Sequence, residues 1–268
     1  MRLACNLSLM FTEVPLLERF QKAADAGFKT VEIQFPYEES AEDLAAAKKA
    51  AGVEVCLINV PAGDLMQGGE GLACVPSKEK EFEDALKLCA KYVKALNVKA
   101  VNVLPGRCEF KGEEAIYLKM FKKNIKKAAA ALEKIGVLCT FEAINTQDMP
   151  GFLIHSVDQM LDVIAEVQHP NLKMQFDIYH MQIMDGRIDE TIRHHSNDIG
   201  HIQFADVPGR GEPDSGQLNF KQIFAAIAHS EYKGFVAAEY RPTGITEDSL
   251  AWLEKYDLEW LDREAIME

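Results

Sequence analysis

The chain lacks a long hydrophobic run, a C-x-x-C pair and an excess of basic residues. Without roughly 18 consecutive apolar residues, no segment is predicted to span a membrane. The formal net charge is −13, and an acidic surface repels phosphate backbones, so we expect no nucleic-acid partner. The one basic cluster, between Lys119 and Lys134, has the helical spacing of a solvated outer face.

The six cysteines form no closely spaced pair, and several lie in apolar strand-like or helical runs. A buried thiol behaves as a small hydrophobic group, and unpaired cysteines are typical of reducing compartments. The segment from Met1 to Met10 has one basic residue and continues directly into a strand-like run, unlike a signal peptide. We therefore expect a reduced, cytoplasmic protein.

No linker rich in proline, glycine or serine, no low-complexity tract and no fixed-period repeat divides the chain. We therefore predict one domain over residues 1–268. Short apolar runs alternate with segments of 3.6-residue apolar periodicity. The predicted strands are 2–9, 30–35, 53–60, 99–104, 137–142, 172–177, 199–204 and 234–239. The predicted helices are 15–26, 40–51, 77–96, 113–135, 156–167, 187–197, 219–230 and 246–257.

Residues at the helix boundaries support these assignments. Gly27, Gly52 and Gly136 each follow a predicted helix, where a left-handed C-terminal cap is expected. Ser156 precedes a helical run and can cap its N-terminus, and Pro15 lies where a first helical turn begins. The boundaries thus agree with the apolar periodicity.

Eight strands that alternate with helices predict parallel pairing through right-handed crossovers. A closed (β/α)₈ TIM barrel and a doubly wound open sheet both fit this pattern. A dinucleotide-binding sheet would carry a glycine-rich phosphate loop after its first strand, whereas this segment reads Asn6-Leu-Ser-Leu-Met-Phe11. The sequence therefore favours the α/β class and a single TIM barrel.

Each of the last four predicted strands ends in a polar residue that can bind a metal ion. These residues are Glu142, Asp177, Gln203 and Glu239. Because the carboxyl ends of barrel strands converge on one mouth, the four side chains are predicted to meet there. Any one of them could instead cap a helix or begin a turn, but four in consecutive units favour a common site. Carboxylate and amide oxygens suit Mg²⁺ or Mn²⁺ better than zinc.

Side chains two residues before these strand ends face the same way. This places Thr140, Gln175 and His201 in the lumen, where residues are usually apolar. We interpret them as groups that orient the metal ligands by hydrogen bonding. The alternative is a set of polar core groups satisfied by water.

Three stretches carry specific motifs: Phe141-Glu-Ala-Ile-Asn-Thr-Gln-Asp-Met-Pro-Gly-Phe152, Phe176-Asp-Ile-Tyr-His-Met-Gln182 and His201-Ile-Gln-Phe-Ala-Asp-Val-Pro-Gly-Arg-Gly-Glu-Pro213. They resemble the hydroxypyruvate isomerase family of the xylose isomerase-like TIM barrels, and the resemblance runs from Asn6 to Pro242. It implies that the four strand-end residues bind the metal. It also implies that Glu142 and Glu239 form the acid–base pair. Related keto-sugar epimerases carry histidine where Gln203 stands, which argues against a ketose 3-epimerase.

One loop departs from the family pattern. A Gly-Glu-Arg-Gly motif often follows the third strand there, whereas residues 67–71 read Gln-Gly-Gly-Glu-Gly, which places Glu70 at the arginine position. If that arginine holds a substrate carboxylate, this chain must do so otherwise or use a different substrate. Close relatives include 2-oxotetronate isomerases, so a four-carbon substrate stays open. The long, glycine-rich segment 61–78 is either a lid or a flexible loop.

The resemblance implies conversion of hydroxypyruvate into 2-hydroxy-3-oxopropanoate (tartronate semialdehyde) through an enediolate. One glutamate removes a proton and the other returns one to the adjacent carbon, while the metal stabilises the negative charge. The small hydroxy-keto acid needs local cations, and Arg107 and Arg210 follow the fourth and seventh strands. His180 can contact a substrate oxygen or donate a proton. A surface role for Arg107 and a loop role for His180 are the alternatives.

Further candidates for the mouth are Asn6, Asn59 and Glu32.

Two rival functions would need other sequence features or none beyond the fold. An AP endonuclease on the same barrel needs several metals, more histidine ligands and a basic groove, none of which this sequence indicates. A non-catalytic metabolite-binding barrel is compatible with the fold alone. A homo-oligomer is compatible with the sequence, which does not fix the oligomeric state.

Overall fold

The structure, a computed structural model, describes residues 2–258 and 261. In this part of the chain, eight strands pair in parallel in chain order, and β8 pairs with β1 to close a barrel. The strands are β1 (Leu3–Asn6), β2 (Thr30–Ile33), β3 (Glu54–Asn59), β4 (Ala100–Asn102), β5 (Leu138–Glu142), β6 (Leu172–Asp177), β7 (Ile199–Phe204) and β8 (Val236–Ala238). The predicted TIM barrel is confirmed, and the open-sheet alternative is wrong.

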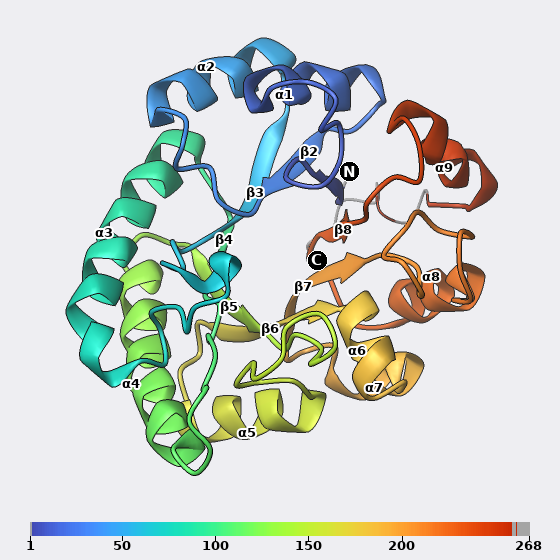
Figure 1. The fold of residues 1–268 in the computed structure, drawn as a ribbon. Helices are drawn as coiled ribbons and strands as arrows, with labels where there is room; N and C mark the ends of the chain where they lie inside the picture. Colours follow the sequence, from blue (N-terminus) through green and yellow to red (C-terminus); the bar gives the residue numbers. More distant parts are fainter. Residues whose placement is uncertain (1, 259–260, 262–268) are drawn as a thin grey trace, which may run out of the picture.

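Helices form a ring around the strands (Figure 1). They are α1 (Leu16–Asp25), α2 (Ala41–Ala51), α3 (Glu79–Leu96), α4 (Glu114–Glu133), α5 (Val157–Val167), α6 (Ile178–Met184), α7 (Ile188–His195), α8 (Phe220–His229) and α9 (Trp252–Lys255). Short 3₁₀ helices cover Leu65–Gln67, Pro76–Lys78 and Glu247–Ala251. Among the described residues, no helix has the length and apolarity needed to cross a membrane.

Local signals explain several helix ends. The Oγ atom of Ser156 accepts a hydrogen bond from the backbone N–H of Gln159, which confirms the predicted cap of α5. Gly52 ends α2 with φ of 68°, the left-handed conformation that glycine adopts at low steric cost. The helices therefore begin and end close to where the sequence predicts.

One helix was not predicted. Helix α6 begins directly after β6, because Asp177 caps it by accepting a hydrogen bond at Oδ1 from the backbone N–H of Tyr179, 2.8 Å away. Asp177 thus fills the capping role that was the alternative to metal binding, and its second oxygen, Oδ2, contacts Arg210. The early start of α6 holds Tyr179 and His180 at the mouth of the barrel.

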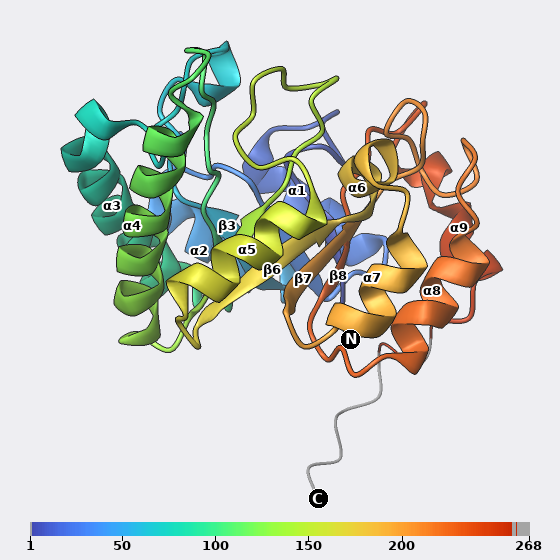
Figure 2. The same ribbon diagram turned by 90° about the horizontal axis from the view of Figure 1, so that it is seen from below.

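The barrel encloses two different environments. Large apolar side chains such as Phe20, Phe141 and Phe176 fill the layer between strands and helices. A small apolar cluster that includes Ala4, Leu57, Ala100 and Ala237 forms a floor inside the barrel. Above this floor the lumen is polar, and long loops after β3, β5 and β7 rise on that side (Figure 2). These loops surround the mouth where a site can form.

Candidate active site

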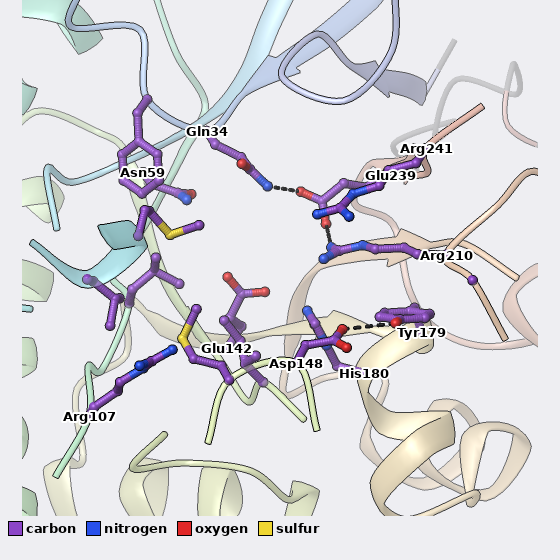
Figure 3. Close-up of a pocket in the computed structure, with 17 residues that line it drawn as sticks. Gln34, Asn59, Arg107, Glu142, Asp148, Tyr179, His180, Arg210, Glu239 and Arg241 are labelled. Carbon is purple, nitrogen blue, oxygen red and sulfur yellow. Dashed lines mark hydrogen bonds and ion pairs between the residues drawn. The ribbon is translucent and has the colours of Figure 1, made fainter. Parts of the chain in front are cut away.

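A cavity of about 530 Å³ opens at the mouth of the barrel. Side chains from both halves of the barrel line it, and the labelled ones point toward a common space (Figure 3). Gln34 and Asn59 line one side, Arg107 a second, and Glu239 with Arg210 a third. A concave, polar site at the carboxyl end of the strands is where TIM-barrel enzymes carry their chemistry.

The strand register brings the four predicted metal ligands to this mouth. Asp177 of β6 lies opposite Gln203 of β7, one strand away from Glu142 at the end of β5. A carboxylate oxygen of Glu142, one of Asp177 and a ring nitrogen of His180 lie within 4.8 Å of one another. Glu239, directly after β8, is joined to Asp177 through Arg210.

Arg210 shows that this cluster accepts a positive charge. Its Nη2 atom lies 3.1 Å from Oδ2 of Asp177 and also contacts Oε2 of Glu239. A guanidinium shared by two buried carboxylates takes the place that a cation would take between them. Glu142 approaches Asp177, and Gln203 lies opposite Asp177 in the strand register. Three carboxylates and an amide are donors that suit a hard divalent ion.

Burial controls the protonation of the two glutamates. Loss of hydration raises the pKa of Glu142 to about 8, and repulsion by Asp177 adds to this shift. Burial also raises the pKa of Glu239 well above its ordinary value, although Arg210 opposes the shift. For Arg210, burial acts to lower the pKa, but attraction to Glu239 and Asp177 raises it overall, so the guanidinium stays charged. Glu142 can therefore hold or release a proton near neutral pH, and burial favours the protonated form of Glu239.

Neutral amides hold the two glutamates in place. Asn102 donates from Nδ2 to Oε1 of Glu142 at 2.9 Å. Asn6 and Gln34 each donate to Oε1 of Glu239 at 2.8 Å. Asn102 and Gln34 were not predicted as site residues, although Asn102 ends its strand just as the predicted ligands do. The polar strand end was the signal that could have identified it.

The three lumen residues predicted to orient the ligands have hydrogen-bond partners in the protein. Gln175 donates from Nε2 to Oε1 of Gln203 at 2.8 Å. His201 lies with Nε2 at 2.5 Å from Oε2 of Glu32. The hydroxyl of Thr140 has only long contacts, 3.4 Å to the carbonyl of Val101 and 3.5 Å to Gln175. Gln175 thus contacts a predicted ligand directly, whereas His201 does so through Glu32.

His180 lies at the mouth as a neutral ring. Burial lowers its pKa to about 4, despite the opposing attraction of Asp177. Its Nδ1 atom is 2.7 Å from Nδ2 of Asn145, which can only donate, so the ring proton is assigned to Nε2. Nε2 lies 3.4 Å from Oδ2 of Asp177, and the residue lines the cavity. His180 is therefore a hydrogen-bond donor rather than a metal ligand in this arrangement.

The predicted substrate-binding residues divide into two groups. Arg107, Arg210, Asn59 and His180 line the cavity. Asn6 is fully buried and is instead bonded to Glu32 and Glu239. The Nε atoms of Arg107 and Arg210 are buried without a hydrogen-bond partner among the described residues, so both retain donor capacity. Arg241, which was not predicted, also lines the cavity.

Glu70 does not line this cavity. Its carboxylate accepts a hydrogen bond from the hydroxyl of Tyr117 at 2.6 Å, and its backbone carbonyl accepts one from the N–H of Arg107 at 2.9 Å. Glu70 thus connects the 61–78 segment to the loop that carries Arg107. The same segment contributes Leu65 and Met66 to the cavity wall.

Known proteins resemble this chain over nearly its full length. Residues 20–256 match the family described as xylose isomerase-like TIM barrel. The hydroxypyruvate isomerase of Escherichia coli strain K12 is 40% identical, covering 96% of this chain and 99% of its own. The 2-oxo-tetronate isomerase of Cupriavidus necator is 37% identical, covering 95% of this chain and 98% of its own.

A solved structure extends the likeness to three dimensions. The structure titled AP endonuclease, family 2, from Brucella melitensis superposes with a TM-score of 0.91 at 38% identity. The match covers 95% of this chain and 98% of the other. The chain therefore belongs to the xylose isomerase-like TIM barrel family, and it is an enzyme of the hydroxypyruvate isomerase type.

Proposed function

We propose that this chain is a metal-dependent isomerase that converts hydroxypyruvate into 2-hydroxy-3-oxopropanoate. The observation that carries the proposal is the buried carboxylate cluster at the mouth, in which Glu142 and Glu239 both have raised pKa values. The names of the relatives from Escherichia coli and Cupriavidus necator support an acid of three or four carbons as substrate.

The metal is proposed to be Mg²⁺ or Mn²⁺, held by Glu142, Asp177, Gln203 and Glu239. Three carboxylates and an amide oxygen are the donors that these ions prefer, and Arg210 already contacts two of them. When bound, a divalent ion supplies Lewis-acid stabilisation of the negative charge that develops on the substrate.

Glu142 and Glu239 are proposed to exchange protons with the substrate from different sides of the cavity (Figure 3). A proton leaves C3 for one carboxylate, the other carboxylate delivers a proton to C2, and the hydroxyl proton moves from the C3 oxygen to the C2 oxygen. The carbonyl thereby moves from C2 to C3 without net gain or loss of atoms. Carboxyl groups whose pKa values are raised by burial suit this exchange, because each can hold the proton that it transfers.

The remaining cavity residues are proposed to position the substrate. The Nε2–H group of His180 can donate to a substrate oxygen while Nδ1 accepts from Asn145. Arg107 and Arg241 offer cations for the substrate carboxylate, and Arg210 offers a third once it leaves the acidic cluster. Glu70 stands where the family often has an arginine, and in this proposal these arginines bind the substrate carboxylate in its place.

The decisive experiment measures turnover of hydroxypyruvate, a four-carbon 2-oxo acid and a free ketose by the metal-free protein and after addition of Mn²⁺ or Mg²⁺. We expect activity on a 2-oxo acid that EDTA removes and Mn²⁺ restores. Activity only on the ketose, or full activity without metal, would refute the proposal.

A 2-oxo-tetronate isomerase is the second candidate, because the cavity of about 530 Å³ leaves room for a fourth carbon. The ratio of kcat/KM for the two acids decides between these candidates. An endonuclease is disfavoured, because a net charge of −13 opposes approach to nucleic acid. Incubation with abasic DNA should give no cleavage.

A further inference from the structure

Glu32 on β2 is a buried carboxylate that the proposed reaction does not use. It is completely buried and does not line the cavity. Its Oε1 atom accepts hydrogen bonds from Nδ2 of Asn6 at 2.8 Å and from Nε2 of Gln203 at 2.6 Å. Its Oε2 atom lies 2.5 Å from Nε2 of His201. A carboxylate is costly to bury, so this arrangement calls for an explanation.

The contact with Gln203 fixes the orientation of an amide that has two different ends. Oε1 of Glu32 acts as an acceptor for two amide groups, so it faces the NH₂ end of Gln203. The oxygen end is turned away from Glu32 and accepts from Nε2 of Gln175 at 2.8 Å. A flipped amide would bring its oxygen against the carboxylate and its NH₂ group against that of Gln175. Both contacts would then be repulsive.

Glu32 also acts on a second proposed ligand. The Nδ2 atom of Asn6 donates at 2.8 Å to Oε1 of Glu32 and at 2.8 Å to Oε1 of Glu239. The two carboxylates therefore share one amide group. Glu32 contacts Gln203 directly and Glu239 through Asn6.

A second metal site is the other function that these residues could serve. Donor atoms of Glu32, Cys56 and His201 lie within 4.8 Å of one another. Each of these residues, however, has a hydrogen-bond partner, because Cys56 contacts the carbonyl oxygen of Val31 and His201 contacts Glu32. The cluster is satisfied without an ion, which favours a role in positioning.

We propose that Glu32 is a positioning residue that selects the oxygen end of Gln203 for the ligand cluster. This inference rests on the proposed function, since the cluster is the proposed metal site. What matters is a hydrogen-bond acceptor facing Gln203 and Asn6. The negative charge of Glu32 is not itself required.

Two substitutions separate the acceptor from the charge. In Glu32→Gln, the amide oxygen can face Asn6 and Gln203 while the NH₂ group donates to Nε2 of a neutral His201. In Glu32→Met, the size is similar but no acceptor remains. Glu54→Met is the matched control, because Glu54 lies on the neighbouring strand β3 with an exposed side chain.

The first measurement needs no metal. The side-chain ¹⁵NH₂ resonances of Gln203, assigned by their loss in Gln203→Glu, report its hydrogen bonding. We expect them to shift strongly in Glu32→Met and little in Glu32→Gln or Glu54→Met. Unchanged resonances in Glu32→Met would overturn the proposal, whatever the reaction of the enzyme.

The second measurement is Mn²⁺ binding by electron paramagnetic resonance. We expect Glu32→Met to weaken binding about 10- to 100-fold and Glu32→Gln to retain it within a few-fold. Equal losses in both variants would show that charge matters and would overturn the acceptor role. If the unaltered protein binds no Mn²⁺, the proposed function fails, while the ¹⁵NH₂ resonances still decide the role of Glu32. If Glu32→Met does not fold, Glu32→Asp, which withdraws the acceptor, takes its place.

Discussion

The two halves of the barrel present different chemistry to the mouth. Strands β1, β3 and β4 end in neutral amides, namely Asn6, Asn59 and Asn102. Strands β5 and β6 end in carboxylates, β7 carries Gln203, and Glu239 follows β8. The amide half donates to the acidic half, through Asn102 to Glu142 and Asn6 to Glu239. Amides can orient carboxylates but cannot cancel their charge, and in this structure Arg210 supplies the cation that contacts Asp177 and Glu239.

The largest expected effect comes from removing either acid of the charged half. Glu142→Gln and Glu239→Gln keep the side-chain shape but cannot take up a proton as a base. We expect kcat to fall about 10²- to 10⁴-fold in each variant, whereas Glu54→Gln should leave it unchanged. Steady-state turnover of hydroxypyruvate with saturating Mn²⁺ measures this. Full turnover in both variants would show that the acidic half of the mouth contributes no more to catalysis than the amide half.

The raised pKa of Glu142 predicts a pH dependence of metal binding. Below its ordinary pKa the group is protonated in both the folded and the unfolded chain. Between that pH and about pH 8, the folded protein keeps a proton on Glu142 that the unfolded chain has lost. The contribution of Glu142 to the free energy of unfolding therefore declines as pH rises. A metal ion must displace this proton. Apparent Mn²⁺ affinity should therefore rise with pH, and the part of the rise that comes from Glu142, about tenfold per pH unit, should end near pH 8.

Mn²⁺ titrations between about pH 6 and pH 8.5 check this expectation. The slope should decrease in Glu142→Gln, because that side chain has no proton to release, whereas Glu239 still has one. An affinity that does not change with pH in the unaltered protein would mean that the acidic half is already ionised.

Arg210 is expected to compete with the metal for the acidic half. Arg210→Gln removes the cation that contacts Asp177 and Glu239. Mn²⁺ binding without substrate should tighten about tenfold, while KM rises about tenfold because the substrate carboxylate loses a partner. Isothermal titration and steady-state kinetics measure the two effects. Arg193→Gln is the control, because Arg193 forms an exposed pair with Asp189.

Weaker Mn²⁺ binding in Arg210→Gln would contradict the competition. It would indicate that the guanidinium supports the ligands rather than standing in for an ion.

The smallest expected effect is a difference in stability between substitutions of Asn102 and Asn59, two strand-end amides of the neutral half. The Oδ1 atoms of Asn59 and Asn102 both lack a partner among the described residues, but Nδ2 of Asn102 donates to Glu142, and Asn102→Leu removes that contact. Asn102→Leu should lower the free energy of unfolding by about 1–3 kcal/mol, and Asn59→Leu by less. Urea denaturation of the metal-free proteins compares them. Equal losses would mean that the contact with Glu142 adds nothing.

Much of the fold was predictable from the sequence because its signals are local. The strand and helix periods set the order of elements, and the strand ends identified Glu142, Asp177 and Glu239 as neighbours. Helix α6 escaped prediction because Asp177 is both the last residue of β6 and the cap of the helix, which leaves no connecting loop as a signal.

The contacts across the lumen were not predictable. Glu32 and His201 are 169 positions apart, and their contact depends on the tilt and register of strands on different sides of the barrel. The pairing of Arg210 with Asp177 and Glu239 depends on the path of a loop, where Arg210 has a positive φ of 57°. Apolar periodicity carries no information about either contact. The strand-end residues were therefore predictable, whereas Gln34, Arg241 and the hydrogen bonds across the lumen were not.

The apolar floor formed by Ala4, Leu57, Ala100 and Ala237 fills the lumen at the end away from the mouth. The cavity that contains Glu142 and Glu239 opens at the mouth, on the side away from this floor. A single movement of the surrounding loops, such as the one that carries Leu65 and Met66, would then isolate the carboxylates and a reactive intermediate from bulk solvent together. A barrel open at both ends would need a second moving segment to close its other end.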